Sequence, residues 1–244
     1  MKKATKEAAI AHAISVFPTE SCGLVAIVKG KEKYFPCVNR AQTKSEHFII
    51  SGEEWAEVED QGEITGVVHS HPNASSIPSQ GDKIQCENTG VNWYILSIGQ
   101  EPGQDPYFHD MTAISPSGYE APLVGREFFH GVSDCYTLIR DYYKRVMGVE
   151  LTNYERTDGW WDRGENLYMK NLEDEGFYEV SEKDMRKGDM IVMQIMAKEP
   201  NHAGVYLGDG LFLHHLYGRL SSRDVYGGMW REATRIIVRH KDAK

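Results

Sequence analysis

A segment rich in proline and glycine divides this chain of 244 residues into two halves with different patterns. The segment runs from about position 99 to position 125, and four prolines lie between 102 and 122. Such composition is typical of loops and linkers, because proline lacks a backbone donor and glycine adopts turn conformations. The length fits one large domain or two small ones. We predict a first domain over residues 1–115, a linker over 116–121 and a second domain over 122–244.

The composition is that of an ordinary folded protein, with 41% hydrophobic and 26% charged residues. The 27 basic and 36 acidic residues give a formal charge of −9, which argues against a nucleic-acid partner because phosphate contacts need clustered Lys and Arg. No apolar run approaches the roughly 18–20 residues of a membrane span. The start lacks the apolar core of a secretory signal, which predicts folding in a cytoplasm. The four cysteines are too few and too irregularly spaced for a disulfide framework.

Both halves mix helical and strand-like patterns, which predicts α+β folds. The first half fits an α/β or α+β unit, with an N-terminal helix that ends at Pro18 and further helices at 52–59 and 82–88. Its expected strands cover 23–28, 34–38, 64–69 and 91–98, and residues 107–114 are either part of the loop segment or a last strand of this unit. The second half has helices first and then a run of strands. Its helices are expected at 135–147 and 164–174, and its strands at 191–195, 203–207, 211–216 and 236–239.

A candidate metal site follows the apolar run 64–68. His69 and His71 are two residues apart, so on a strand both imidazoles lie on one face. Asp82 follows after a loop that contains two prolines. Two His and one carboxylate leave the fourth position of a tetrahedral zinc site for water, as catalytic sites require. A carboxylate outside the coordination shell is then needed to accept the proton of that water.

The string from His69 to Asp82, HSHPNASSIPSQGD, resembles the JAMM (MPN-type) metalloprotease motif. The upstream string PTESCG at 18–23 resembles the Pro-x-Glu-x-Cys-Gly signature of the same family. The resemblance covers residues 1–114. It implies a zinc cofactor held by His69, His71 and Asp82, with Glu20 as general base and Ser79 supporting the oxyanion. The family hydrolyses peptide or isopeptide bonds.

A candidate nucleophile opens the first predicted helix of the second half. Cys135 follows Asp134, and a helix N-terminus favours the thiolate through its free N–H groups and partial positive charge. Such a cysteine needs a His base and a residue that orients the base. His202 begins the strand 203–207, and the returning strand ends in His214-His215. Only one of these two can share a face with His202. A two-residue Asp209-Gly210 turn favours His215, whereas a three-residue loop favours His214.

Residues 122–240 resemble the NlpC-type papain-like peptidases, through Asp134-Cys135, the run KGDM at 187–190, the string HAGVYLG at 202–208 and FLH at 212–214. The resemblance implies Cys135 as nucleophile, His202 as base and His214 as orienting residue. Members mostly cut peptidoglycan stem peptides. They usually carry a tyrosine about a dozen residues before the cysteine, where this chain has Leu123. Arg126 or Tyr136 is a candidate replacement for that hydroxyl.

A JAMM-like domain followed by an NlpC-type domain resembles the tail tip assembly proteins of lambda-like tailed phages. This resemblance implies a peptidase that works with phage tail tip proteins and bacterial peptidoglycan. It places the protein in the host cytoplasm during assembly, and at the virion tail tip and in the periplasm during infection. Three hypotheses follow: a bifunctional peptidase acting mainly on peptidoglycan, a processing protease for tail proteins, and a structural tail component with residual sites. The leucine at position 123, in place of the usual tyrosine, favours the structural component. The retained motif residues argue against it.

Overall fold

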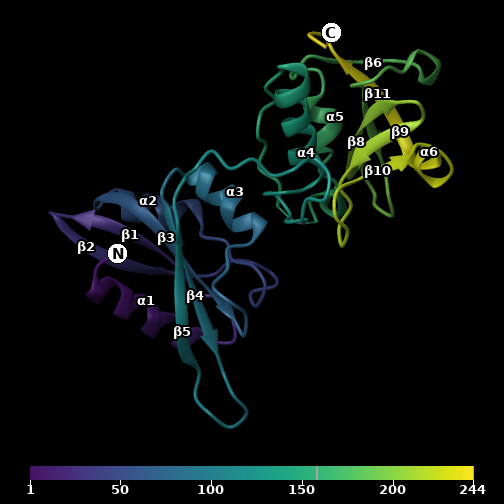
Figure 1. The fold of residues 1–244 in the computed structure, drawn as a ribbon. Helices are drawn as coiled ribbons and strands as arrows, with labels where there is room; N and C mark the ends of the chain where they lie inside the picture. Colours follow the sequence, from purple (N-terminus) through teal and green to yellow (C-terminus); the bar gives the residue numbers. More distant parts are fainter. Residues whose placement is uncertain (158, 244) are drawn as a thin grey trace. The chain divides into compact units, whose positions relative to one another are not determined.

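The computed structural model describes residues 1–157 and 159–243. The chain forms two compact units, Met1–Tyr119 and Glu120–Lys244 (Figure 1). Each unit is built on its own β-sheet with helices on both faces, and the two are described separately below. In the described parts of both units, every helix is too short or too polar to cross a membrane.

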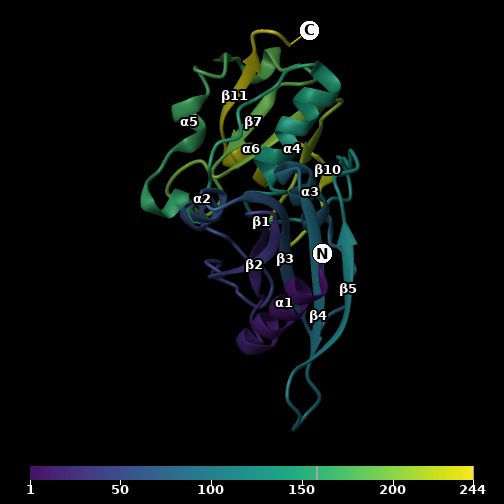
Figure 2. The same cartoon turned by 90° about the vertical axis from the view of Figure 1, so that its left-hand side faces the viewer.

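The first unit contains a five-stranded mixed sheet in the order β2-β1-β3-β4-β5. Only β3 and β4 are parallel, and α3 connects them. The two parallel strands lie side by side in both views, and the β4–β5 hairpin projects beyond the sheet (Figures 1 and 2). The strands are β1 (Cys22–Val28), β2 (Lys31–Cys37), β3 (Glu63–Pro72), β4 (Asn92–Gly99) and β5 (Tyr107–Ile114).

Both faces of this sheet are buried, which explains the nearly continuous apolar runs of β1 and β4. The alternation of side chains along β1 sends Val25 toward α1 (Lys3–Val16) and Leu24 toward the opposite face. On that opposite face the core includes Val58 of α2 (Gly52–Glu59) and Cys86 of α3 (Gln80–Thr89). The sheet is therefore the middle layer of three.

The second unit contains a six-stranded antiparallel sheet in the order β10-β9-β8-β7-β11-β6. One face packs against α4 (Cys135–Tyr142) and α5 (Leu167–Asn171), and the other against α6 (Met229–Ala233). A π-helical turn, Tyr143–Met147, extends α4. Short 3-10 turns cover Trp160–Arg163 and Glu182–Asp184. The strands are β6 (Phe177–Glu179), β7 (Met190–Met193), β8 (His202–Gly208), β9 (Leu211–His214), β10 (Ser222–Val225) and β11 (Thr234–His240).

The structure confirms the predicted α+β class and departs from the expected elements in the second unit. The helix expected at 164–174 is only five residues long, because Gly164 has a left-handed conformation that ends the preceding 3-10 turn. Asn166 then begins α5 by accepting a hydrogen bond from the Met169 N–H. The strands β6 and β10 and the helix α6 were not expected, and each has five residues or fewer.

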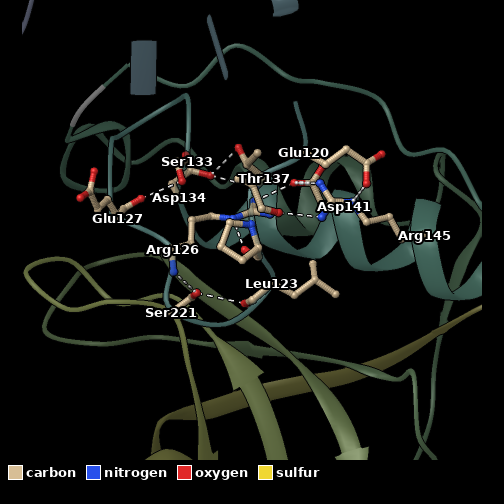
Figure 3. Close-up of polar contacts among 12 residues, drawn as sticks. Glu120, Leu123, Arg126, Glu127, Ser133, Asp134, Thr137, Asp141, Arg145 and Ser221 are labelled. Atoms are coloured by element: carbon tan, nitrogen blue, oxygen red, sulfur yellow. Dashed lines mark hydrogen bonds and ion pairs between the residues drawn. The ribbon is translucent and has the colours of Figure 1, made fainter. Parts of the chain in front are cut away.

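A fully buried arginine fixes the segment that precedes the second sheet (Figure 3). The Arg126 guanidinium lies 2.7 Å from the carboxylate of Asp141 on α4. It also donates to the carbonyl oxygens of Ala121 and Pro122, at 2.9 Å each. The backbone N–H of Arg126 donates to the Ser221 hydroxyl, which in turn donates to the carbonyl of Leu123. Arg126 therefore ties residues 121–126 to α4 and to the segment before β10.

Replacement of Arg126 by Met is expected to lower the free energy of unfolding of the second unit by about 3–5 kcal/mol, because it removes the buried guanidinium from Asp141 and leaves the Pro122 carbonyl without its donor. Arg145 also contacts Asp141, but its side chain is 23% exposed. The matched variant Arg145→Met should cost about 1 kcal/mol. Denaturant titrations of both variants test this, and equal losses would contradict the role assigned to Arg126.

Candidate active sites

The predicted metal ligands come together where β3 meets the start of α3. The Nε2 atoms of His69 and His71 are 3.1 Å apart. The Asp82 carboxylate approaches them at 3.2 Å and 3.4 Å through its two oxygens. His69 is 1% exposed, and its ring contacts the rings of Phe48 and Trp93. The strand supplies two imidazoles on one face, and the helix N-terminus supplies the carboxylate.

Local hydrogen bonds orient His71 and Asp82. The other ring nitrogen of His71, Nδ1, lies 2.8 Å from the carbonyl of Ser75, which leaves Nε2 free of the proton. Ser79 caps α3 by accepting from the Asp82 N–H, and its own N–H donates to Asp82 Oδ2 at 2.7 Å. The observed role of Ser79 is thus to hold Asp82. Its support of an oxyanion stays a prediction.

Glu20 lies beside this cluster at the start of β1. Burial raises the pKa of the Glu20 carboxyl to about 7, and the nearby His69 and His71 oppose that shift. Its backbone is fixed by hydrogen bonds to Lys44 and Asn39. A carboxyl group whose pKa is near neutral is suited to accepting and returning a proton.

The donor set fits a metal ion. The ligand atoms of His69, His71 and Asp82 lie within 4.8 Å of one another. Two imidazole nitrogens and one carboxylate oxygen form a set that zinc accepts in catalytic sites. The interaction with both imidazoles holds the pKa of Asp82 well below its usual range, although burial opposes this. The carboxylate is therefore ionised, as a ligand must be.

The predicted nucleophile sits at the N-terminus of α4. Asp134 caps this helix by accepting from the Thr137 N–H at 2.9 Å, and it forms a buried ion pair with Arg156. The Cys135 thiol interacts with the backbone N–H of Ala203, next to His202 on β8. Burial raises the pKa of this thiol to about 11, and Asp134 adds to that shift. The resting sulfur is therefore protonated.

Three side chains from neighbouring strands form a chain behind the thiol. His202 Nε2 lies 3.0 Å from His214 Nδ1, and His214 Nε2 lies 3.2 Å from the carboxylate of Asp224 on β10. Burial lowers the pKa of His202 to about 3, and His214 contributes to that shift. Burial opposes ionisation of Asp224, but hydrogen bonds from Arg219, Ser222 and His214 outweigh it and lower its pKa to about 2. The array joins neutral histidines to an ionised carboxylate.

A bulge in the β8–β9 hairpin selects His214 as the partner of His202. The turn has two residues, Asp209 and Gly210, both with positive φ, and Gly208 pairs with Leu211. The register then shifts between Tyr206 and Gly208, so that Gly204 pairs with His214. His214 therefore shares a face with His202, two residues from Gly204. His215 points to the other face and contacts Phe128.

Two residues at this site were not found from the sequence. Asp224 lies on the short strand β10, and the Tyr168 hydroxyl lies 3.4 Å from Cys135 Sγ. Residues 222–225, SRDV, show no polar–apolar alternation, so no local signal marks Asp224 or Tyr168. Tyr136 and Arg126, the two candidates to replace the tyrosine hydroxyl missing at Leu123, have other partners. Tyr136 donates to the Thr152 carbonyl, and Arg126 binds Asp141.

Comparisons with known proteins identify both units. The family model described as prokaryotic homologs of the JAB domain matches residues 2–110, and the NlpC/P60 family model matches residues 125–239. A CysO-cysteine peptidase of Mycobacterium tuberculosis is 28% identical over 43% of this chain and 73% of that protein. The fold and sites thus define a JAB-like domain followed by an NlpC/P60 domain, two classes that suggest a peptidase.

Longer matches give the particular family. The tail tip assembly protein K of Escherichia phage N15 is 40% identical over the whole of this chain and 97% of its own length. The protein of the same name from Escherichia phage lambda is 36% identical over 79% of this chain and 89% of its own length. The chain belongs to the family of phage tail tip assembly proteins K.

Loss of one ligand is expected to empty the metal site. We expect His71→Ala and Asp82→Ala to lose the bound metal of the purified chain, measured by elemental mass spectrometry, while His109→Ala on β5 keeps it. A chelator should lower the melting temperature of the first unit, because a ligand that binds only the native state stabilises it. Metal at wild-type stoichiometry in both ligand variants would refute the assignment.

Proposed function

We propose that this tail tip assembly protein is a bifunctional peptidase. Its second unit acts as a cysteine endopeptidase on peptidoglycan stem peptides, and its first unit as a zinc-dependent peptidase or isopeptidase. Two observations carry the proposal. Cys135 lies at a helix N-terminus, where its thiol interacts with the backbone N–H of Ala203, the residue after His202, and the Nε2 atom of His202 lies 3.0 Å from Nδ1 of His214.

The contacts of the array define which nitrogen acts as the base. Asp224 is an acceptor, so His214 presents its Nε2–H to it. His214 Nδ1 then accepts from the Nε2–H of His202. The Nδ1 atom of His202 is left without a proton and is able to receive one from Cys135. The ionised Asp224 stabilises the positive charge that develops along the two imidazoles.

The reaction proceeds in two stages. His202 takes the thiol proton as the Cys135 sulfur bonds to the carbonyl carbon of the substrate peptide. The carbon–nitrogen bond then breaks, and the leaving amine takes the proton from His202. Water next gives a proton to His202 while its oxygen bonds to the same carbon. The carbon–sulfur bond breaks, the acid is released, and the proton returns to the sulfur.

The first unit supplies a second site, in which His69, His71 and Asp82 would hold zinc. A bound zinc ion supplies Lewis acidity that activates water and polarises a carbonyl group. Glu20 accepts the proton of the attacking water and returns it to the leaving amine. Ser79 supports the oxyanion as well as holding Asp82. The 28% identity with a CysO-cysteine peptidase supports a peptidase role for this unit.

Digestion of purified peptidoglycan tests the proposed substrate. We expect the full chain to release new peptide fragments, identified by mass spectrometry, and Cys135→Ala to release none, because the sulfur forms the covalent intermediate. His71→Ala should keep this activity, since it alters only the first unit. No fragments from the wild-type chain would shift the assignment to processing of tail proteins, which become the next substrates.

The His214–Asp224 contact provides a quantitative test of the array. Asp224→Asn keeps the shape but removes the charge that stabilises the histidine pair, so kcat for peptidoglycan fragments should fall about tenfold or more with KM nearly unchanged. His240 and Asp242 form another His–Asp contact, at 3.9 Å, in the same unit. Asp242→Asn is the matched control and should leave kcat at the wild-type value. Equal kcat in both variants would exclude Asp224 from the mechanism.

A further inference from the structure

The Tyr168 hydroxyl reaches the sulfur of Cys135 from a distant part of the chain. Tyr168 lies on α5, 33 residues after the cysteine, and its oxygen is 3.4 Å from Sγ. The ring is 8% exposed and is fixed by contacts with Tyr136 and Trp160. The position of the hydroxyl beside the sulfur is therefore set by core packing.

The hydrogen bonding of Tyr168 differs from that of two other buried tyrosines in this unit. Tyr136 and Tyr143 donate to backbone carbonyls, of Thr152 at 2.9 Å and of Gly188 at 2.6 Å. Within residues 1–157 and 159–243, the Cys135 thiol is the only hydrogen-bonding partner of the Tyr168 hydroxyl. A thiol is a weak acceptor, so this buried hydroxyl is poorly satisfied in the resting state.

Ionisation of Cys135 strengthens the hydrogen bond that the Tyr168 hydroxyl donates to the sulfur. A thiolate is a charged acceptor, and hydrogen bonds to charged acceptors are about twice as strong as neutral ones. The hydroxyl thus stabilises the ionised sulfur more than the neutral thiol, which is the condition for lowering a barrier. Burial holds the pKa of Tyr168 well above its usual range, so the phenol keeps the proton that it must donate.

We propose that Tyr168 is a further catalytic residue of the cysteine site, whose hydroxyl donates a hydrogen bond to the Cys135 sulfur as the thiol loses its proton to His202. The inference rests on the proposed function of this site. Leu123, at the place where similar peptidases carry a tyrosine, packs its side chain against the core. In this chain the hydroxyl beside the sulfur comes from α5.

Several groups act on the same sulfur and must be kept constant in a test. Asp134 disfavours the thiolate, whereas Arg156 and the backbone N–H of Ala203 favour it. His202 faces the site from β8 and receives the proton. Tyr168→Phe leaves all of these in place and removes one oxygen. Tyr136→Phe is the matched control, because it removes a similarly buried phenol that donates to a carbonyl instead of the sulfur.

The rate of alkylation of Cys135 by iodoacetamide, measured from pH 5 to pH 11 on the full chain, reports the thiolate directly. Mass spectrometry of the Cys135 peptide separates it from the three other cysteines, which are buried. We expect Tyr168→Phe to raise the pKa of the thiol by about one unit, which lowers the alkylation rate about tenfold at every pH well below that pKa. The alkylation profile of Tyr136→Phe should superimpose on that of the wild-type protein. Superposition of Tyr168→Phe on wild type would overturn the proposal.

A second substitution covers the case in which Tyr168→Phe does not fold. Site-specific 2,3-difluorotyrosine at position 168 keeps the ring and strengthens the donor, so the pKa of the thiol should fall, and an unchanged pKa would overturn the proposal. His202→Ala separates this inference from the proposed function. An alkylation profile unchanged by His202→Ala would refute the Cys–His pair itself, whatever the Tyr168 variants show.

Discussion

Helix capping is the interaction on which both sites depend. Ser79 caps α3 and holds Asp82 against the two imidazoles of β3, and Asp134 caps α4 and fixes the first residue of that helix, Cys135. In each unit a buried strand brings histidines to the same place, so a rigid sheet and a capped helix meet at the chemistry. A cap satisfies backbone N–H groups that would otherwise be unpaired, and here it also aims a functional side chain.

Long, regular elements were predictable because their apolar patterns were strong. The helix expected at 52–59 has those same bounds in the structure, and the strand expected at 91–98 is shifted by one residue, to Asn92–Gly99. The strands β6 and β10 were missed because they have only three and four residues, which are extended through pairing with β11 and β9. The helix expected at 164–174 was shortened because Gly164 and Asn166 act as local stop and start signals.

In the sites, too, what depends on local spacing was predictable, and what depends on packing between distant segments was not. The sequence pointed to His69, His71 and Asp82 through their spacing, and the structure places their donor atoms together. Tyr168 approaches Cys135 only because the packing of α5 against α4 brings them together, and no spacing along the chain encodes that contact. The register of the hairpin likewise depended on a bulge, since a two-residue turn alone predicts His215 as the partner.

The bulge in the β8–β9 hairpin has a consequence for how this chain tolerates change. If Leu207 entered regular pairing in place of the bulge, β9 would slide by one position and His215 would lie opposite Gly204 in place of His214. Because the two neighbours are both histidines, an imidazole would still face His202 after the slip. The pair His214-His215 thus preserves an imidazole opposite His202 when the register of the hairpin shifts by one residue.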